Sequence, residues 1–88
     1  MRADKAKVSR LLKTARGQID GILNMVEEDR YCVDISNQIM ATEAILKKVN
    51  LEVLHGHIDS CVKDAVETGN TSEMLEEVRS IIDKLSKL

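Results

Sequence analysis

Both histidines of the chain and one of its two cysteines lie in one stretch of seven residues, HGHIDSC (55–61). His57 and Cys61 are four residues apart, so on a helix their side chains share one face. Imidazole and thiolate are common ligands of transition metals, so this pair forms half of a candidate metal site. His55 points elsewhere, and we interpret it as a surface residue. The second cysteine, Cys32, is the candidate for the missing ligand.

Two thiolates and one imidazole form a soft ligand set. Soft thiolates favour Cu(I), and a three-coordinate Cu(I) site needs no further ligand. Zn(II) prefers four ligands in a tetrahedron, so a water or a carboxylate would have to complete a zinc site. A simpler interpretation of each cysteine also exists, because a buried free cysteine often acts only as a small hydrophobe. Three methionines on apolar stripes are interpreted as core residues rather than copper ligands: Met25, Met40 and Met74.

The elements that carry these side chains are predicted to be helices. Apolar residues at three- and four-residue steps predict helices over 5–28 and 71–86, and the charged stretch EEDRYC (27–32) ends the first. Gly69 suits a helix C-cap, and Asn70 with Glu73 resembles a capping box. Because the chain contains no proline, tryptophan or phenylalanine, we expect an all-α fold rather than a sheet.

Between these two helices, one uninterrupted apolar pattern predicts a long central helix over 33–67. Asp34 or Ser36 is available as its N-cap. Gly56 is its only weak point, at a cost of about 1 kcal/mol relative to alanine. Three helices leave a central helix of this length with uncovered apolar surface, which a second copy of the chain would bury.

The length of the central helix decides how Cys32 could reach the other two ligands. Cys32 and His57 are 25 residues apart, which is about 37 Å along a continuous helix. They therefore cannot bind one ion within a chain. In an antiparallel pair, Cys32 of one copy approaches His57 and Cys61 of the other, and a two-fold axis makes two such sites. A helix that bends back at Gly56 would contradict this expectation.

Length and composition limit the class of protein. With 88 residues we expect a single small domain, 1–88, whose core is marginal without oligomerisation. No apolar run approaches the roughly 20 residues of a membrane span and no signal-peptide pattern opens the chain. We therefore expect a soluble cytoplasmic protein without a membrane partner, whose cysteines are ligands or reactive thiols. No motif positions a general base, so we expect neither an enzyme nor a small-molecule substrate.

The formal net charge of −2 is unevenly distributed along the chain. Residues 52–88 contain eight acids and four bases. Residues 1–16 contain one acid, Asp4, and six bases: Arg2, Lys5, Lys7, Arg10, Lys13 and Arg16. Such a basic end can be a nucleic-acid contact or only a solvated helix face, and charge alone leaves both interpretations open.

Three segments together resemble the copper-sensitive operon repressor (CsoR) family, small all-helical repressors that also include nickel/cobalt and formaldehyde sensors. They are RLLKTARGQIDGILNMVEEDRYCVDISNQI (10–39), VLHGHIDSCV (53–62) and LEEV (75–78). The resemblance covers nearly the whole chain. It implies an antiparallel dimer, usually paired into a tetramer, without a winged helix or a helix-turn-helix.

The resemblance also implies roles for particular residues. Copper sensors of this family use a Cys, a His and a Cys at the positions of Cys32, His57 and Cys61, with the first ligand from the opposite protomer. They place a Tyr and a Glu behind these ligands, at the positions of Tyr31 and Glu77. Such a partner on the far nitrogen of His57 would fix its tautomer and could relay metal binding to the helices.

Other sensors of the family depart from this ligand set. Nickel/cobalt sensors have an N-terminal histidine and a histidine in place of Cys61, and formaldehyde sensors lack that cysteine. Persulfide sensors keep both cysteines but lack the histidine at position 57. The combination in this chain therefore points to Cu(I).

For DNA, the family uses basic side chains on the first helix and in the middle of the second. Arg16 and Lys48 match basic positions of that pattern, and Arg10 and Lys13 lie nearby. The chain departs from the pattern at Leu11, where a basic residue is expected. DNA binding through such residues should weaken steeply with salt.

From the sequence we predict a Cu(I)-responsive repressor that binds operator DNA without metal and releases it when copper binds, so that copper-resistance genes are expressed. It should act as a homodimer or homotetramer. One alternative is a thiol or persulfide sensor that uses only Cys32 and Cys61. Another is a copper- or zinc-binding protein with no role at DNA, which would show no salt-dependent DNA binding.

Overall fold

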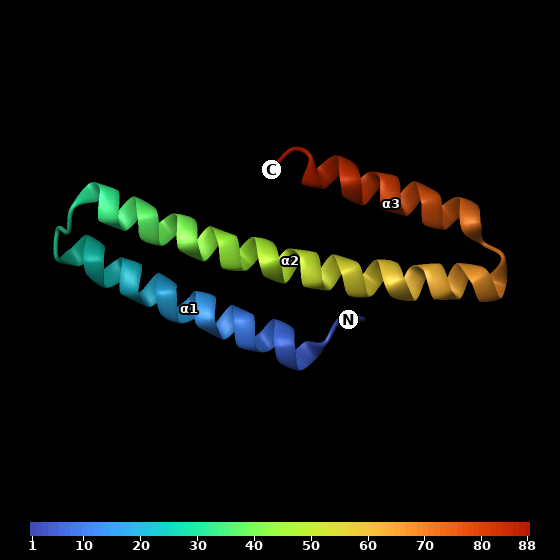
Figure 1. The fold of residues 1–88 in the computed structure, drawn as a ribbon, viewed down its shortest axis with the longest axis horizontal. Coiled ribbons are helices and arrows are strands. Elements are labelled where there is room, and N and C mark those ends of the chain that lie inside the picture. The colour runs from blue at the N-terminus through green and yellow to red at the C-terminus, as the bar shows by residue number, and fades with distance from the viewer.

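The computed structural model describes residues 1–88 and contains three helices and no strand. They are α1 (Lys5–Glu27), α2 (Cys32–Thr68) and α3 (Thr71–Leu85). Figure 1 shows α1 running antiparallel along the first part of α2, and α3 folding back along its last part on the other side. The predicted all-α fold is confirmed, with helix bounds within one residue of those expected.

The turn between α1 and α2 has a specific chemical cause. Asp29 adopts a left-handed backbone conformation with φ 52°. The N–H of Asp29 donates to the carbonyl of Val26, and the N–H of Arg30 donates to the carbonyl of Met25. These two bonds form a Schellman motif, which usually has glycine at the left-handed position, although aspartate tolerates it. The motif ends α1 and reverses the chain.

The beginning of α2 differs from the sequence expectation. The N-cap is Tyr31, one residue before Cys32, and no side chain caps this end. The Tyr31 carbonyl instead accepts the N–H groups of Asp34 and Ile35 at 3.0 and 3.2 Å. The prediction of Asp34 or Ser36 as N-cap was therefore wrong, because the Schellman turn places the chain in helical geometry earlier than either residue.

The turn between α2 and α3 is close to expectation. Gly69 is the C-cap of α2, with φ 77° and its N–H donating to the Ala65 carbonyl at 2.7 Å. Asn70 precedes α3, but its amide donates to the Glu73 carboxylate at 2.9 Å rather than accepting from the helix backbone. The two side chains pair as predicted, yet they do not form the reciprocal capping box.

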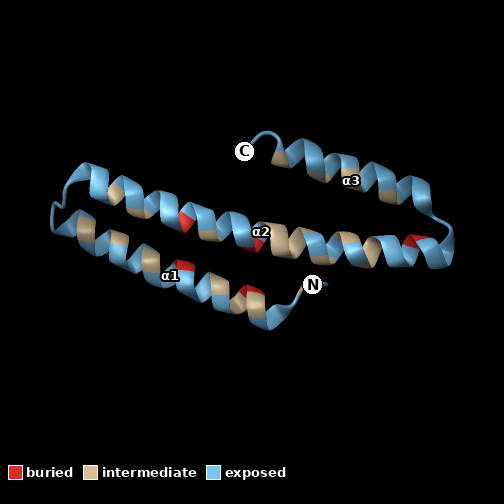
Figure 2. Cartoon of the chain, viewed as in Figure 1, coloured by how far each residue is buried: buried red, intermediate tan, exposed pale blue.

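The helices form one flat layer. The extents of the chain are 57 × 28 × 12 Å, and a thickness of that order is a single helix diameter. The radius of gyration is 17.6 Å, against about 12 Å for a compact domain of this length. Both faces of the layer are therefore open to solvent, which Figure 2 shows as a predominance of exposed residues.

The core within one chain is correspondingly small. Only five residues are buried, all at helix contacts: Val8, Ala15, Thr42, Val49 and Ala65. Thr42 donates its hydroxyl to Gln18 at 2.8 Å and so fixes α1 against α2. Many large apolar side chains remain exposed, including Leu12, Ile19, Leu23, Val26, Ile39, Met40, Leu46, Leu75 and Ile82. No helix is both long enough and apolar enough to cross a membrane.

Candidate metal centre and nucleic-acid face

The three candidate metal ligands lie on one stripe of α2. The helix is continuous from Cys32 to Thr68, so Gly56 does not bend it back. The 25 residues between Cys32 and His57 correspond to within about 20° of seven whole turns, and Cys61 follows about one turn later. The stripe thus carries one thiol at the start of α2 and an imidazole with a second thiol near its end.

One chain does not bring the three side chains together. No group of three or more metal-binding side chains of the His, Cys, Asp and Glu types exists within the chain. Cys32 and Cys61 are both free thiols, the first exposed and the second half-buried. Along a continuous helix Cys32 and His57 are separated by about 37 Å. A site that uses all three residues must therefore take Cys32 from another chain.

His57 is held by a residue of α3. Its Nε2 atom contacts the Oε1 atom of Glu77. An ionised carboxylate only accepts hydrogen bonds, so this contact favours the tautomer with the proton on Nε2 and leaves the lone pair of Nδ1 available for a metal. The arrangement fits a metal-binding imidazole, since such histidines usually donate their other nitrogen to a carboxylate or a carbonyl.

A small hollow of about 140 Å³ lies beside Cys61, between the end of α2 and the start of α3. Three carboxylates line it, from Asp64, Glu73 and Glu77, and Met74 contributes its apolar side chain. Cys61 and the Glu77 carboxylate behind His57 therefore share one half-open cleft with acidic walls.

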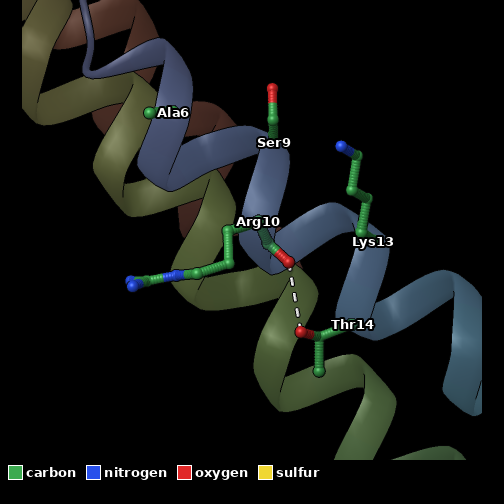
Figure 3. A pocket seen from close by; sticks show the side chains of 5 residues that line it. All are labelled: Ala6, Ser9, Arg10, Lys13 and Thr14. Carbon is green, nitrogen blue, oxygen red and sulfur yellow. Dashed lines mark hydrogen bonds between the residues drawn. The ribbon is translucent and has the colours of Figure 1, made fainter.

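The candidate DNA-contact residues lie on α1 and on the adjoining part of α2. Arg10 and Lys13 are one turn apart and line a shallow hollow on the surface of α1 with Ala6, Ser9 and Thr14. Figure 3 shows both cationic groups reaching into solvent, while the Thr14 hydroxyl donates to the Arg10 carbonyl at 3.1 Å. Arg16 and Lys48 are exposed as well. These cations are open to a ligand with phosphate groups.

Comparison with known proteins identifies the family. Residues 4–84 match the family model described as metal-sensitive transcriptional repressor. The chain is 42% identical over 84 residues to the copper-sensing transcriptional repressor CsoR of Bacillus subtilis, which covers 96% of the chain and 83% of the relative. This chain belongs to the metal-sensitive transcriptional repressor family. It spans 64% of the length of the copper-sensing transcriptional repressor CsoR of Mycobacterium bovis.

Solved structures of this repressor family share the fold. The copper-sensing repressor CsoR with Cu(I) from Geobacillus thermodenitrificans superposes with a TM-score of 0.83 at 32% identity, over 98% of this chain and 93% of the other. The nickel-responsive transcriptional regulator InrS gives a TM-score of 0.85 at 27% identity, over 96% of this chain and 94% of the other. The resemblance to the CsoR family is confirmed, and the chain is a transcriptional repressor rather than an enzyme.

Tyr31, which the resemblance places behind the ligands, does not contact His57 within one chain. Tyr31 precedes α2, is 69% exposed and lies at the opposite end of the helix from His57. Within one chain only Glu77 supports His57, so Tyr31 could do so only from a second chain. His55 is exposed, and its imidazole makes a small electrostatic contribution to the lowered pKa of Glu52.

Gly56 has a role that the sequence did not reveal. A Cβ atom at this position would lie 2.7 Å from the Cα and 2.9 Å from the Cβ of Ala3. The absence of a side chain therefore lets the N-terminal segment cross α2 in van der Waals contact, directly beside His57. The sequence pattern presented Gly56 only as a weak point of the helix, because no local signal indicates which segment will pass over it.

A second contact at the same place joins α1 to α2. Lys7 Nζ lies 2.8 Å from Glu52 Oε1, and both side chains are about one-third exposed. The hydrogen bond from Lys7 is the main cause that lowers the pKa of Glu52 below its ordinary value. Partial burial opposes this shift, while the charges of Lys7, His55 and Lys48 add to it. The residues are 45 positions apart, so sequence spacing could not have paired them.

Proposed function

We propose that this repressor senses Cu(I), which is bound by Cys32 of one chain together with His57 and Cys61 of a second chain. The observation that supports this proposal most is the placement of the three residues on one face of α2. Cys32 is too far from His57 and Cys61 to bind the same ion within one chain. Two thiolates and an imidazole suit Cu(I). The relatives named as copper sensors support this choice over nickel.

The partner that completes the site is a second, antiparallel copy. A groove between the middle of α2 and the end of α3 is lined by six apolar residues, Met40, Ala44, Leu46, Leu51, Leu85 and Leu88, and by Glu43, Lys47 and Asn50. No other segment of the chain covers this groove. An antiparallel copy would bury this groove and bring each Cys32 to the opposite end of its partner's α2. We propose such a homodimer, paired further into a homotetramer.

The residues of the centre have separate tasks. The thiolates of Cys32 and Cys61 and the imidazole of His57 would hold a Cu(I) ion, which would act there as a soft Lewis acid. Cys61 and the Nδ1 atom of His57 present two donors from adjacent turns. Glu77 keeps the proton on Nε2 and links the imidazole to α3. Tyr31 of the second chain, next to its Cys32, would lie against the same histidine.

Operator DNA is the proposed partner of the basic face. Arg10, Lys13 and Arg16 of α1 and Lys48 of α2 would contact phosphates, and an antiparallel assembly would join the basic faces of several chains. Binding should therefore depend steeply on salt. We propose that the metal-free repressor binds DNA in the cytoplasm and that the copper-bound form releases it, so that copper-resistance genes are expressed.

The experiment is an anaerobic Cu(I) titration of the reduced, metal-free protein on DNA from its own promoter region, followed by fluorescence anisotropy. We expect loss of DNA binding at one Cu(I) per chain, and no response from Cys32→Ala. Copper that binds tightly without changing DNA affinity would refute the proposal. Zn(II) and a polysulfide serve as competing effectors, and release by polysulfide that survives His57→Ala would favour a thiol sensor instead.

A further inference from the structure

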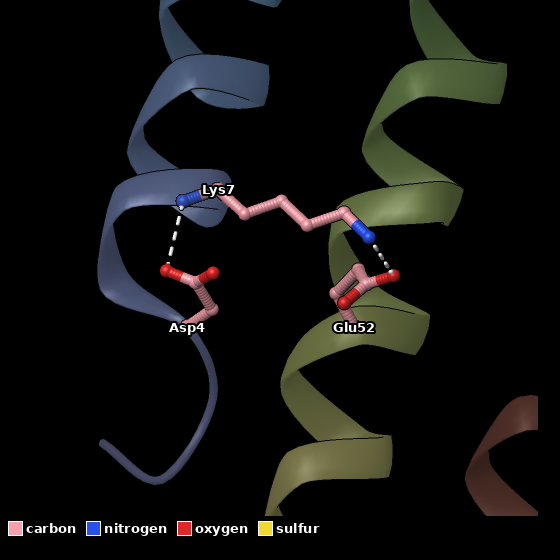
Figure 4. Close-up of polar contacts among 3 residues, drawn as sticks. All are labelled: Asp4, Lys7 and Glu52. Carbon is pink, nitrogen blue, oxygen red and sulfur yellow. Dashed lines mark hydrogen bonds and ion pairs between the residues drawn. The ribbon is translucent and has the colours of Figure 1, made fainter.

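The ion pair between Lys7 and Glu52 has an unusual position in the fold. It is the only ion pair that connects α1 with α2. Figure 4 shows Lys7 reaching across from the first turn of α1, where its backbone N–H also donates to Asp4, to the Glu52 carboxylate on α2. One residue thus belongs both to the capped beginning of α1 and to the link between the helices.

The neighbours of this pair belong to both proposed sites. Glu52 precedes His57 by five residues on the same continuous helix, and it follows Lys48 by four. Lys7 precedes Arg10 by one turn of α1. Lys48 is close enough to Glu52 that its positive charge helps to lower the pKa of this carboxylate. The pair therefore lies between a candidate metal ligand and candidate DNA contacts on two helices.

From this geometry we infer that Lys7 and Glu52 are positioning residues that link the metal-binding end of α2 to the basic face. The inference rests on the proposed function and extends it. The pair holds the N-terminal end of α1, which leads to Arg10 and Lys13, against the part of α2 between Lys48 and His57. A change in the direction of α2 near His57 then alters the spacing of cations across the two helices, and thereby their match to phosphates.

Stability alone would not reveal such a role. Exposed ion pairs contribute little to the free energy of folding, and a contact transmits a change between sites only if its energy differs between the two states. The informative quantity is the coupling ratio, defined as the dissociation constant for DNA with Cu(I) divided by that without it. Allosteric proteins typically show ratios of about 5- to 150-fold.

The test measures this ratio for the full-length oligomer with one Cu(I) per chain, for wild type, Lys7→Met, Glu52→Gln and the charge-reversed pair Lys7→Glu/Glu52→Lys. We expect each single variant to lower the ratio by about 5- to 30-fold, the upper part of the range that substitutions between two coupled sites produce. The reversed pair should recover the wild-type ratio to within about twofold, because it restores the contact with opposite polarity. Cu(I) affinity, measured by chelator competition, should stay the same for Glu52→Gln.

Lys5→Met is the matched control. Lys5 is exposed in the first turn of α1 and forms no ion pair. Its loss should weaken DNA binding with and without copper alike and leave the ratio unchanged. Single variants that keep the wild-type ratio, or a reversed pair that fails to recover it, would overturn the inference. A wild-type protein that does not release DNA with copper would instead refute the proposed function.

Discussion

The two halves of α2 are covered in opposite ways. The first half, from Cys32 to about Asn50, packs against α1 on one side, and on the other it borders a largely apolar groove that the end of α3 also lines. The second half carries His57 and Cys61 and is covered by α3, by the N-terminal segment at Gly56 and by Lys7. Each half contains what the other lacks: a thiol beside an open groove, and a supported imidazole and thiol without their third ligand.

With the proposed ligand set, a single chain would be an incomplete sensor. In the proposed dimer, a two-fold axis across α2 would place the first half of one copy against the second half of the other. The same operation would bury apolar surface and complete the proposed ligand set. Stability of the assembly and formation of the metal site are therefore expected to depend on each other.

The largest effect is expected from a charge in the groove. Leu46 is 43% exposed and lines it. In Leu46→Glu the carboxylate would lose its hydration in the proposed dimer, at a cost of several kcal/mol. We expect the dimer dissociation constant to rise by at least about 100-fold, measured by sedimentation equilibrium. Leu46→Met, which conserves volume, should remain oligomeric. An unchanged Leu46→Glu oligomer would place the interface elsewhere.

The next effect concerns the support of His57. Glu77→Gln replaces a carboxylate that holds Nε2 by a neutral amide, and Cu(I) affinity should fall about 10- to 100-fold. Glu76→Gln changes an exposed neighbour on α3 and is the control. Chelator competition measures the Cu(I) affinity of both variants. If Glu77→Gln bound Cu(I) as tightly as Glu76→Gln, the Glu77 contact would not be part of the metal centre.

His57→Ala extends the same comparison. It should weaken the coupling between copper and DNA more than it weakens copper binding, because two thiolates remain as ligands while the link to α3 is lost. DNA anisotropy titrations at saturating Cu(I) measure the coupling. If the variant still leaves DNA as wild type does, the connection through His57 and Glu77 is wrong.

A smaller effect is expected from the close approach at Gly56. In Gly56→Ala the new Cβ would overlap Ala3, which should destabilise the protein by about 1–3 kcal/mol or displace the N-terminal segment. Gly17→Ala is matched, because nothing lies near its Cβ position and alanine favours a helix by about 1 kcal/mol. Thermal unfolding should therefore shift in opposite directions for the two variants. A stabilised Gly56→Ala would contradict the contact.

The smallest effect is the pH dependence of the Lys7–Glu52 pair. Because the pKa of Glu52 is lowered in the folded chain from its ordinary value of 4.5, its stabilisation is present above that pH. It is lost as the pH falls through the lowered folded-state pKa. The difference in unfolding temperature between wild type and Glu52→Gln should thus shrink on acidification below pH 4.5. If this difference in unfolding temperature grew on acidification, the ionised Glu52 carboxylate would not be the stabilising form.

The helices were predictable because their signals are local. Apolar spacing and the left-handed Gly69 fixed α2 and α3 to within a residue. The turn at Asp29 was harder to recognise, because the left-handed position of a Schellman motif is usually glycine. The distance argument for Cys32 also needed only a continuous helix, which the structure has.

The contacts around the centre were less accessible to sequence reasoning. Glu77 came from a family resemblance, whereas Ala3 with Gly56 and Lys7 with Glu52 were not foreseen. These contacts depend on how far α1 slides along α2, and that register is set by packing of residues such as Ala15 and Val49 together with the Thr42–Gln18 hydrogen bond. No short motif encodes such a register.

The central claim is that each metal site uses residues of two chains. Cys32→Ala and Cys61→Ala subunits, carrying different affinity tags, can be co-expressed and the mixed dimer purified by both tags. An antiparallel dimer of this kind retains one complete site, from Cys32 of one subunit with His57 and Cys61 of the other. We predict that the mixed dimer binds one Cu(I) tightly while both single-variant homodimers bind copper only weakly. A mixed dimer that binds copper no better than the homodimers would contradict the account.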